Sequence, residues 1–295
     1  MHLNISTPET TKNLPMTIDL HTHSIASDGD LGPRELLDTA VNLGVKVLAL
    51  TDHDTVAGYR HLLESDDLRC KLISGVELSC QWSNSTIHIV GLNIDIESPS
   101  ITFGLKILNQ ARSDRASMIA QRLAKLGFEG TLEGAIGVAG ESQIGRPHFA
   151  QFMTKNGYVK NNADAFKKYL GSGKCGDVKV FWPNLAQVVG WIVDSGGVAV
   201  LAHPLKYRFT RTKLRRLVMD FCYAGGHALE VISGWQQNAD TCYLAKTSVD
   251  FELLASVGTD FHKQRSYGAA LGEKMILPSI CTPVWQQWDI DIGDF

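Results

Sequence analysis

Histidines and carboxylates recur in this chain at positions where apolar runs of the sequence end. Six of the ten histidines lie at such positions, and three or four acids share them. In parallel α/β folds the C-terminal ends of the strands form one functional face, so these side chains are expected to converge. Imidazole and carboxylate groups suit divalent transition ions. The residues concerned are His21, His23, Asp28, Asp52, His53, Glu77, His88, His203, Asp260 and His262.

The spacing of two pairs strengthens this interpretation. His21 and His23 are separated by one residue, as are Asp260 and His262. On a strand this spacing directs both side chains to one side, so each pair could coordinate one metal ion. A single histidine at a strand end is more often a hydrogen-bonded core or surface residue than a ligand. A whole set of imidazoles and acids at one expected sheet edge favours a metal site.

The elements that must position these residues alternate along the chain. Runs of apolar and β-branched residues predict strands, and amphipathic segments with glycine or proline at their ends predict helices. Strands are expected at 17–20, 45–50, 71–76, 87–92, 198–203, 228–233 and 253–260. Helices are expected between them at 33–43, 56–64, 185–194, 212–223 and 238–249. This alternation predicts an α/β fold with a parallel sheet or barrel.

The alternation is interrupted in the middle of the chain. Residues 98–183 contain helical patterns at 103–126, 147–156 and 163–170 and no convincing strand. We therefore expect three parts. They are a flexible extension over 1–15, an α/β unit with the metal site formed by 16–97 and 184–295, and a helical cap inserted at 98–183.

Composition limits the class of protein. With 295 residues, 44% of them hydrophobic and 20% charged, the chain can bury a sizeable core. A net charge of −3 argues against a uniformly basic nucleic-acid-binding protein, although a local basic patch remains open. No apolar run is long enough for a membrane span, and the N-terminus lacks the apolar segment of a secretory signal. Six cysteines without C-x-x-C spacing indicate reduced thiols. We expect a cytoplasmic protein with no membrane partner and no obligate protein partner.

Six segments resemble, in order, the motifs of the PHP (polymerase and histidinol phosphatase) family. They are DLHTHSIASDG (19–29), LALTDHDT (48–55), GVELSC (75–80), IHIVGLNI (87–94), AHP (202–204) and GTDFH (258–262). IGRPHFA (144–150), YLGSGK (169–174) and Trp182 resemble the small bacterial branch that acts on nucleoside 3′,5′-bisphosphates and trims the 5′ ends of short RNAs. The stretch GDVKVFW (176–182) departs from that branch, which leaves contacts made by the cap open.

The resemblance implies a distorted seven-stranded βα barrel with an inserted helical cap and up to three divalent metal ions. Its motifs assign nine ligands, and Asp52 and Asp54 are expected to orient ligands or shape turns instead. The assigned ligands are His21, His23, Asp28, His53, Glu77, His88, His203, Asp260 and His262.

The number and charge of these ligands fit a cluster of ions. Nine ligands are too many for one transition ion, so two or three ions would share them, with Glu77 as a bridge. Three carboxylates and three divalent ions leave a positive surplus that suits a phosphate and a hydroxide. Mn²⁺ is the expected ion, with Fe²⁺ and Zn²⁺ as alternatives, because no thiolate is present.

The expected reaction is hydrolysis of a phosphomonoester by a metal-activated hydroxide. The leading substrates are a nucleoside 3′,5′-bisphosphate, cleaved at its 3′-phosphate, and a short 5′-phosphorylated RNA. Arg146 and His148, at the start of an inserted helix, and Lys206, after the AHP motif, are candidate substrate contacts. Two alternatives are a phosphatase for histidinol phosphate or another small metabolite, and a non-catalytic metal-binding accessory domain.

Overall fold

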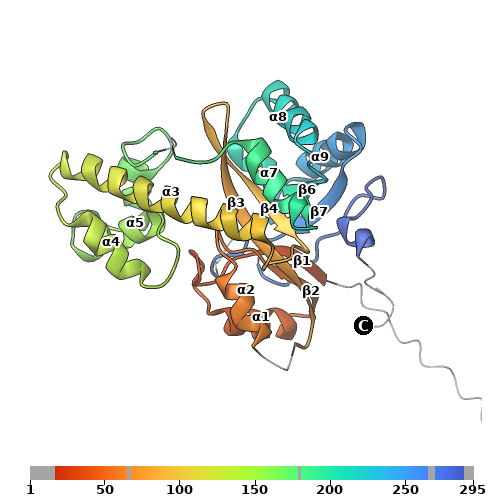
Figure 1. Cartoon of the computed structure of the whole chain (residues 1–295), viewed down its shortest axis with the longest axis horizontal. Helices are drawn as coiled ribbons and strands as arrows, with labels where there is room; N and C mark the ends of the chain where they lie inside the picture. The colour runs from red at the N-terminus through yellow and green to blue at the C-terminus, as the bar shows by residue number, and fades with distance from the viewer. Residues whose placement is uncertain (1–16, 65–67, 179–180, 265–269, 289–295) are drawn as a thin grey trace, which may run out of the picture.

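The computed structural model describes residues 17–64, 68–178, 181–264 and 270–288 (Figure 1). The expected extension over 1–15 lies outside the described residues. Seven strands form one sheet in the order of the sequence. They are β1 (Thr17–Thr22), β2 (Val45–Leu50), β3 (Lys71–Trp82), β4 (Ser85–Leu92), β5 (Val198–Leu201), β6 (Ala228–Ser233) and β7 (Leu254–Gly258).

The sheet curls into a nearly closed barrel because the segment after β7 returns to β1. The backbone N–H of Asp260 donates to the carbonyl of His21 at 2.8 Å, and the N–H of His23 donates to the carbonyl of Phe261 at 2.8 Å. Thr22 and Phe261 also form a parallel bridge. The expectation of an α/β fold with a distorted seven-stranded barrel is therefore confirmed.

One strand runs in the direction opposite to that expected. β4 pairs antiparallel with both β3 and β5, whereas the other neighbouring strands are parallel. β3 continues past its expected end to Trp82, and Ser83 and Asn84, both with positive φ, join it to β4. Positive φ at both positions is typical of a two-residue hairpin turn. As a result His88 lies in the middle of a strand, opposite Ser79, and the prediction that it ends a strand was wrong.

Five helices pack around the barrel close to their expected positions. They are α1 (Pro33–Asn42), α2 (Ala57–Leu63), α7 (Leu185–Asp194), α8 (Arg211–Tyr223) and α9 (Asn238–Asp250). Every residue of β2 except Lys46 is buried, as in a strand covered on both faces. Leu36 and Leu37 of α1 pack with Leu48 and Leu50 of β2 in one core cluster. Each such leucine contributes about 1.5–3 kcal/mol through burial.

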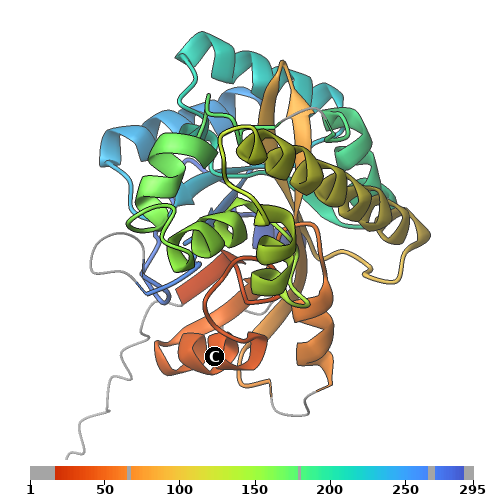
Figure 2. The ribbon, with the colours of Figure 1, turned by 90° about the vertical axis from the view of Figure 1, so that its left-hand side faces the viewer.

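The helices between β4 and α7 lie together on one side of the barrel (Figure 1), and Figure 2 shows them in front of the sheet. They are α3 (Pro99–Ala124), α4 (Thr131–Ala139), α5 (Arg146–Lys155), α6 (Asn162–Ala165) and a π-helix (Phe166–Leu170). The first half of α3 packs into the barrel core through Ile101 and Leu108. Its second half packs with α5 in a separate cluster that includes Leu123 and Phe149. The part of 98–183 that the structure describes contains no strand, and the division into domains stays a prediction.

Helix α4 was not expected from the sequence. Gly134 and Gly137 lower its helix propensity, since glycine loses the most backbone entropy when a helix forms. Gly134 is needed there because Phe152 of α5 packs directly against it. A Cβ at this position would lie 2.0 Å from a ring carbon of Phe152. No described helix combines the length and apolar character that a bilayer crossing requires.

Candidate metal centre

Glu77 lies at the centre of the barrel mouth with five histidine rings around it. Its side chain is fully buried on β3. Oε2 lies 3.3 Å from Nε2 of both His21 and His23 and 2.9 Å from Nδ1 of His53. Oε1 lies 3.0 Å from Nδ1 of His88 and 2.8 Å from Nε2 of His203. The two oxygens of one carboxylate therefore face two different groups of imidazoles, as a bridging ligand would.

Asp260 supplies a second acid from the segment after β7. Its Oδ1 lies 3.1 Å from Nε2 of His23 and 3.5 Å from Nε2 of His21. His21 of β1 and His23, which directly follows β1, thus point to the same side, as their spacing predicts. Asp260 has a φ of 52°, an uncommon conformation for a residue with a side chain, and the hydrogen bond from its N–H to His21 holds it there.

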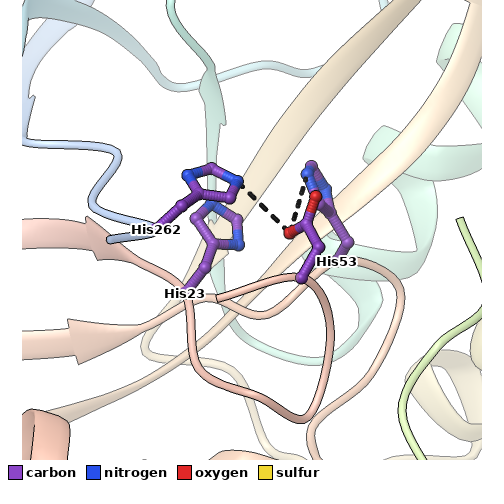
Figure 3. Close-up of side chains that lie close together, drawn as sticks. His23, His53 and His262 are labelled. Atoms are coloured by element: carbon purple, nitrogen blue, oxygen red, sulfur yellow. Dashed lines mark ion pairs between the residues drawn. The ribbon is translucent and has the colours of Figure 1, made fainter. Parts of the chain in front are cut away.

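Asp28 supplies a third acid, on the loop after β1. Its Oδ1 lies 3.2 Å from Nε2 of His262 and 3.9 Å from Nε2 of His53. Figure 3 shows His23, His53 and His262 close together, with dashed lines for the ion pairs that His53 and His262 make. The cluster therefore gathers side chains from six strands or the segments that follow them, as the sequence predicts. The strands are β1, β2, β3, β4, β5 and β7.

Three overlapping groups of ligand atoms could each hold an ion, because the atoms of each group lie within 4.8 Å of one another. His23 belongs to two groups and Glu77 to two, so the groups are contiguous. The first group comprises His21, His23, Glu77 and Asp260, the second His23, Asp28, His53 and His262, and the third His53, Glu77 and His88. His203 touches the same cluster through Glu77.

The hydrogen bonding of these residues fits bound cations. Buried polar atoms in proteins nearly always have a hydrogen-bond partner, so unpaired ones call for an explanation. Here several buried atoms that face one another have none, and each of them can donate electrons to a metal. They are Nε2 of His21, Nε2 of His23, Oδ1 of Asp28, Nδ1 of His53, Oε2 of Glu77 and Oδ1 of Asp260.

The acids are held in the ionised form that binds metals. Burial by itself would raise the pKa of Glu77, but the rings of His53, His21 and His88 hold it well below its usual range. The pKa of Asp260 is lowered against burial in the same way, mainly by His21 and His23. Burial would lower the pKa of His23, yet Asp260 and Glu77 raise it to about 10. Metal ligands must be deprotonated, so a cation would take the place of such protons.

A further acid, Glu230 on β6, supports the cluster from behind. Its Oε1 lies 3.0 Å from Nδ1 of His21, and its Oε2 accepts the backbone N–H of His203. Outer carboxylates of this kind fix the ring orientation of metal-binding histidines. Sequence reasoning missed Glu230, although an acid inside the apolar run ALEVIS was an available signal.

Asp52 has the orienting role expected for it. It accepts hydrogen bonds from the N–H and Oγ of Ser24 and from Oγ of Ser27, each at 2.7 Å. These bonds fix the loop that carries Asp28. Asp54 pairs with Arg112 of α3 at 2.6 Å and so ties the helices on this side to the barrel.

Three arginines line a cleft directly beside the histidine cluster. The cleft has an empty volume of about 480 Å³ and is lined by Arg112, Arg115 and Arg146 together with Asp28 and His53. The guanidinium carbons of Arg112 and Arg115 lie 5.6 and 5.3 Å from the centre of the Trp182 ring, which also lines the cleft. Three guanidinium groups beside a metal-suited cluster make a site for an anion.

Only one of these arginines was predicted. Arg146 begins α5, as expected, and donates to the carbonyl of Leu170 at 3.1 Å. Arg112 and Arg115 were missed because charged residues on helices usually face solvent. Their burial on the apolar side of α3 depends on the fold.

The other two candidate substrate contacts have partners within the protein. Nδ1 of His148 accepts the N–H of Gly145 at 3.0 Å and thereby caps α5, and His148 is not among the residues that line the arginine cleft. Nζ of Lys206 pairs with Oδ2 of Asp260 at the edge of a second, wider groove. Both roles in substrate binding stay predictions.

Residues 19–173 match the PHP domain family. The chain belongs to this family. It is 40% identical to the 3′,5′-nucleoside bisphosphate phosphatase of Chromobacterium violaceum over 93% of this chain and 97% of that protein. It is 42% identical to the 5′-3′ exoribonuclease Rnm of Escherichia coli over 94% of this chain and 95% of that protein. The prediction that this PHP chain is a hydrolase is confirmed.

Solved structures agree with this assignment. An amidohydrolase from Chromobacterium violaceum, solved with bound sulfate and no metal, superposes with a TM-score of 0.83 at 40% identity, covering 92% of this chain and 95% of that one. A structure from Bifidobacterium adolescentis shares the fold with a TM-score of 0.77 at 24% identity, covering 90% and 94%.

Proposed function

We propose that this PHP protein hydrolyses the 3′-phosphate of nucleoside 3′,5′-bisphosphates and also removes 5′ nucleotides from short RNAs. The observation that carries this proposal is the contact between the arginine cleft and the histidine cluster, since Asp28 and His53 line the cleft and belong to the cluster. A substrate with two phosphates can then place one at the cluster and the other among the arginines. The names of the two relatives support the same pair of substrates.

The nine predicted ligands would hold two to three divalent ions, with Glu77 as the bridge. We expect Mn²⁺, with Fe²⁺ and Zn²⁺ as alternatives, because the donors are imidazole and carboxylate groups. When bound, such ions lower the pKa of a water towards about 7 and neutralise phosphate charge.

The side chains of the protein bind and orient the substrate around that chemistry. Arg112, Arg115 and Arg146 bind the 5′-phosphate, and the carbonyl of Leu170 and the ring of Trp182 limit how far these guanidinium groups can move. This fixes the 3′-phosphate over Asp28 and Glu77. Positioning of this kind removes much of the entropic part of the barrier.

The same bond breaks in both substrates. A water oxygen bonds to phosphorus, and the bond between phosphorus and the 3′-oxygen breaks, leaving a 3′-hydroxyl on the nucleotide whose 5′-phosphate lies among the arginines. From a bisphosphate the other product is inorganic phosphate. From RNA it is the shortened chain, which keeps the phosphate as its new 5′-end.

The decisive experiment compares three substrates with the purified protein and Mn²⁺. We expect hydrolysis of adenosine 3′,5′-bisphosphate and of a short 5′-phosphorylated RNA, and much slower hydrolysis of histidinol phosphate, whose single phosphate leaves the arginine cleft unused. Preference for histidinol phosphate would replace the proposal with the metabolite phosphatase, and inactivity on all three would favour an accessory metal-binding domain.

We propose a cytoplasmic location, because all six cysteines are free thiols.

A further inference from the structure

We propose that a groove on the far side of Asp260 and His262 holds the RNA nucleotides that follow the scissile phosphate, with one base stacked on Trp235. This inference rests on the proposed function and adds a path for the part of an RNA that a bisphosphate lacks. It names Trp235 as a residue that selects for RNA.

The groove begins at the metal-suited cluster. Asp28, Asp260 and His262 line it, and Asp28 and Pro147 line both it and the arginine cleft, so the two sites adjoin at Asp28. Its empty volume of about 1610 Å³ is several times the 480 Å³ of the arginine cleft. It runs past Lys206 and Trp235, which also line the adjoining pocket that contains Gln237. The groove therefore extends from the metal-suited cluster to Trp235.

Trp235 presents its ring to solvent beside this groove. Its side chain is 69% exposed, which is unusual for a large apolar ring. The loop that carries it is fixed on both sides. The N–H of Gly234 donates to the carbonyl of Gly258 at 2.7 Å, and Nε2 of Gln236 donates to the carbonyl of Val231 at 2.7 Å. An exposed aromatic face on a fixed loop beside a groove is the kind of platform on which single-stranded bases stack, whatever their sequence.

Charges along the groove suit a phosphate backbone. Lys206 and Lys263 line it, and Asp30 is the acid there that does not belong to the metal-suited cluster. Asp28 and Asp260 would have their charges neutralised as ligands. Lys206, whose side chain is half exposed, pairs with Asp260 and so lies next to the place where the scissile phosphate would bind.

The chemistry separates the two substrates at this groove. In a nucleoside 3′,5′-bisphosphate the scissile 3′-phosphate carries no second nucleotide, so no part of that substrate reaches Trp235. In RNA the phosphorus carries the next nucleotide, which must leave the cluster by a path other than the arginine cleft. The groove past Lys206 provides that path.

The test compares Trp235→Ala with Trp235→Phe on both substrates. For a 5′-phosphorylated tetranucleotide RNA we expect Trp235→Ala to raise KM at least about 10-fold, because a stacked base is lost. The phenylalanine variant should retain most of the affinity. For adenosine 3′,5′-bisphosphate, kcat/KM should stay within about 2-fold of wild type in both variants. Tyr223→Ala, which removes an aromatic residue of 83% exposure outside the groove, is the matched control.

A binding measurement gives a readout independent of turnover. In the presence of a chelator, a 3′-labelled tetranucleotide should bind wild-type protein more tightly than Trp235→Ala by fluorescence anisotropy. Equal loss of activity on both substrates, or no change on either, would overturn the groove assignment. Wild-type protein that hydrolyses the bisphosphate and not RNA would also overturn it. If wild type hydrolyses neither substrate, the proposed function itself fails.

Discussion

His21 and Gly258 lie so close together that a Cβ on Gly258 would fall 2.3 Å from Cβ of His21. This contact lets the end of β7 reach β1, and the hydrogen bond from Asp260 to the carbonyl of His21 follows directly after it. The same contact between β7 and β1 therefore closes the barrel and places His21 beside Asp260. A single glycine connects the fold to the candidate metal site.

Gly258→Ala should consequently destabilise the protein and weaken metal binding together. A methyl group forced into this contact costs about 1–3 kcal/mol of unfolding free energy, measured by urea denaturation. Gly190→Ala on α7 is the control, because a Cβ there meets nothing within 4 Å. It should be neutral or stabilising by about 0.5–1 kcal/mol. Equal stability of the two variants would show that the barrel can open at this seam without cost.

Removal of metal should abolish hydrolysis and lower thermal stability. The buried ligand atoms of His21, His23, Asp28 and Asp260 have no hydrogen-bond partner, and bound cations would compensate them. Dialysis against a chelator should remove activity and lower the Tm, and added Mn²⁺ should restore both, since a ligand that binds only the folded state stabilises it. Elemental analysis of the protein before dialysis gives the stoichiometry, which we expect to be two or three. Full activity after exhaustive chelation would rule out the proposed chemistry.

His53→Ala should remove activity while leaving the fold intact. His53 belongs to two of the three ligand groups, so its loss affects more than one ion. Loss of an outer-shell residue typically costs about 10–100-fold, so loss of a ligand should cost at least about 100-fold in kcat/KM. Metal content per chain should fall as well. His61→Ala, at an exposed histidine on α2, is the control and should behave as wild type. A near wild-type rate for His53→Ala would refute the ligand assignment.

Much of this centre was predictable from the sequence because most of its ligands come from short, ordered motifs at or just after the ends of strands, whereas Glu77 and His88 lie within β3 and β4. Strands such as 45–50 and 228–233 are largely apolar runs, interrupted by Lys46 in the first and by Glu230 in the second, and the structure places β2 and β6 on those residues. The ligands themselves come from far apart in the chain, yet parallel strands bring their C-terminal ends to one edge.

What could not be predicted depends on contacts between distant segments. The direction of β4 was hidden because its turn, Ser83 and Asn84, lacks the glycine that usually marks a tight hairpin. Arg112 and Arg115 look like ordinary surface charges until α3 is placed over the cleft. Helix α4 could not be predicted because Gly134 lowers helix propensity, and only the packing of Phe152 of α5 against Gly134 explains why a glycine is required there.

Arg146→Ala should weaken the use of substrates that carry a 5′-phosphate. Loss of a hydrogen bond to a charged group costs about 1.5–3 kcal/mol, which corresponds to about 10–100-fold in kcat/KM for adenosine 3′,5′-bisphosphate. Adenosine 3′-monophosphate lacks the 5′-phosphate, so the variant should hydrolyse it almost as well as wild type does. Arg216→Ala, at an exposed arginine on α8, should leave both substrates unaffected. An equal loss on both nucleotides would mean that Arg146 acts on the scissile phosphate or on the fold instead.

Glu230→Gln should reduce metal affinity without removing a ligand. Glu230 lies 3.0 Å from Nδ1 of His21 and accepts the N–H of His203, so it orients a ring and a backbone turn that both reach Glu77. The amide keeps the shape of the side chain and removes its charge, which makes Nε2 of His21 a weaker donor. We expect Mn²⁺ affinity, measured by calorimetric titration, to fall about 10–100-fold. Excess Mn²⁺ should restore most of the activity, as a positioning role requires and a catalytic role does not. Glu133→Gln, at an exposed acid on α4, should bind Mn²⁺ as wild type does. Unchanged affinity in Glu230→Gln would mean that the ring of His21 is held by the barrel alone.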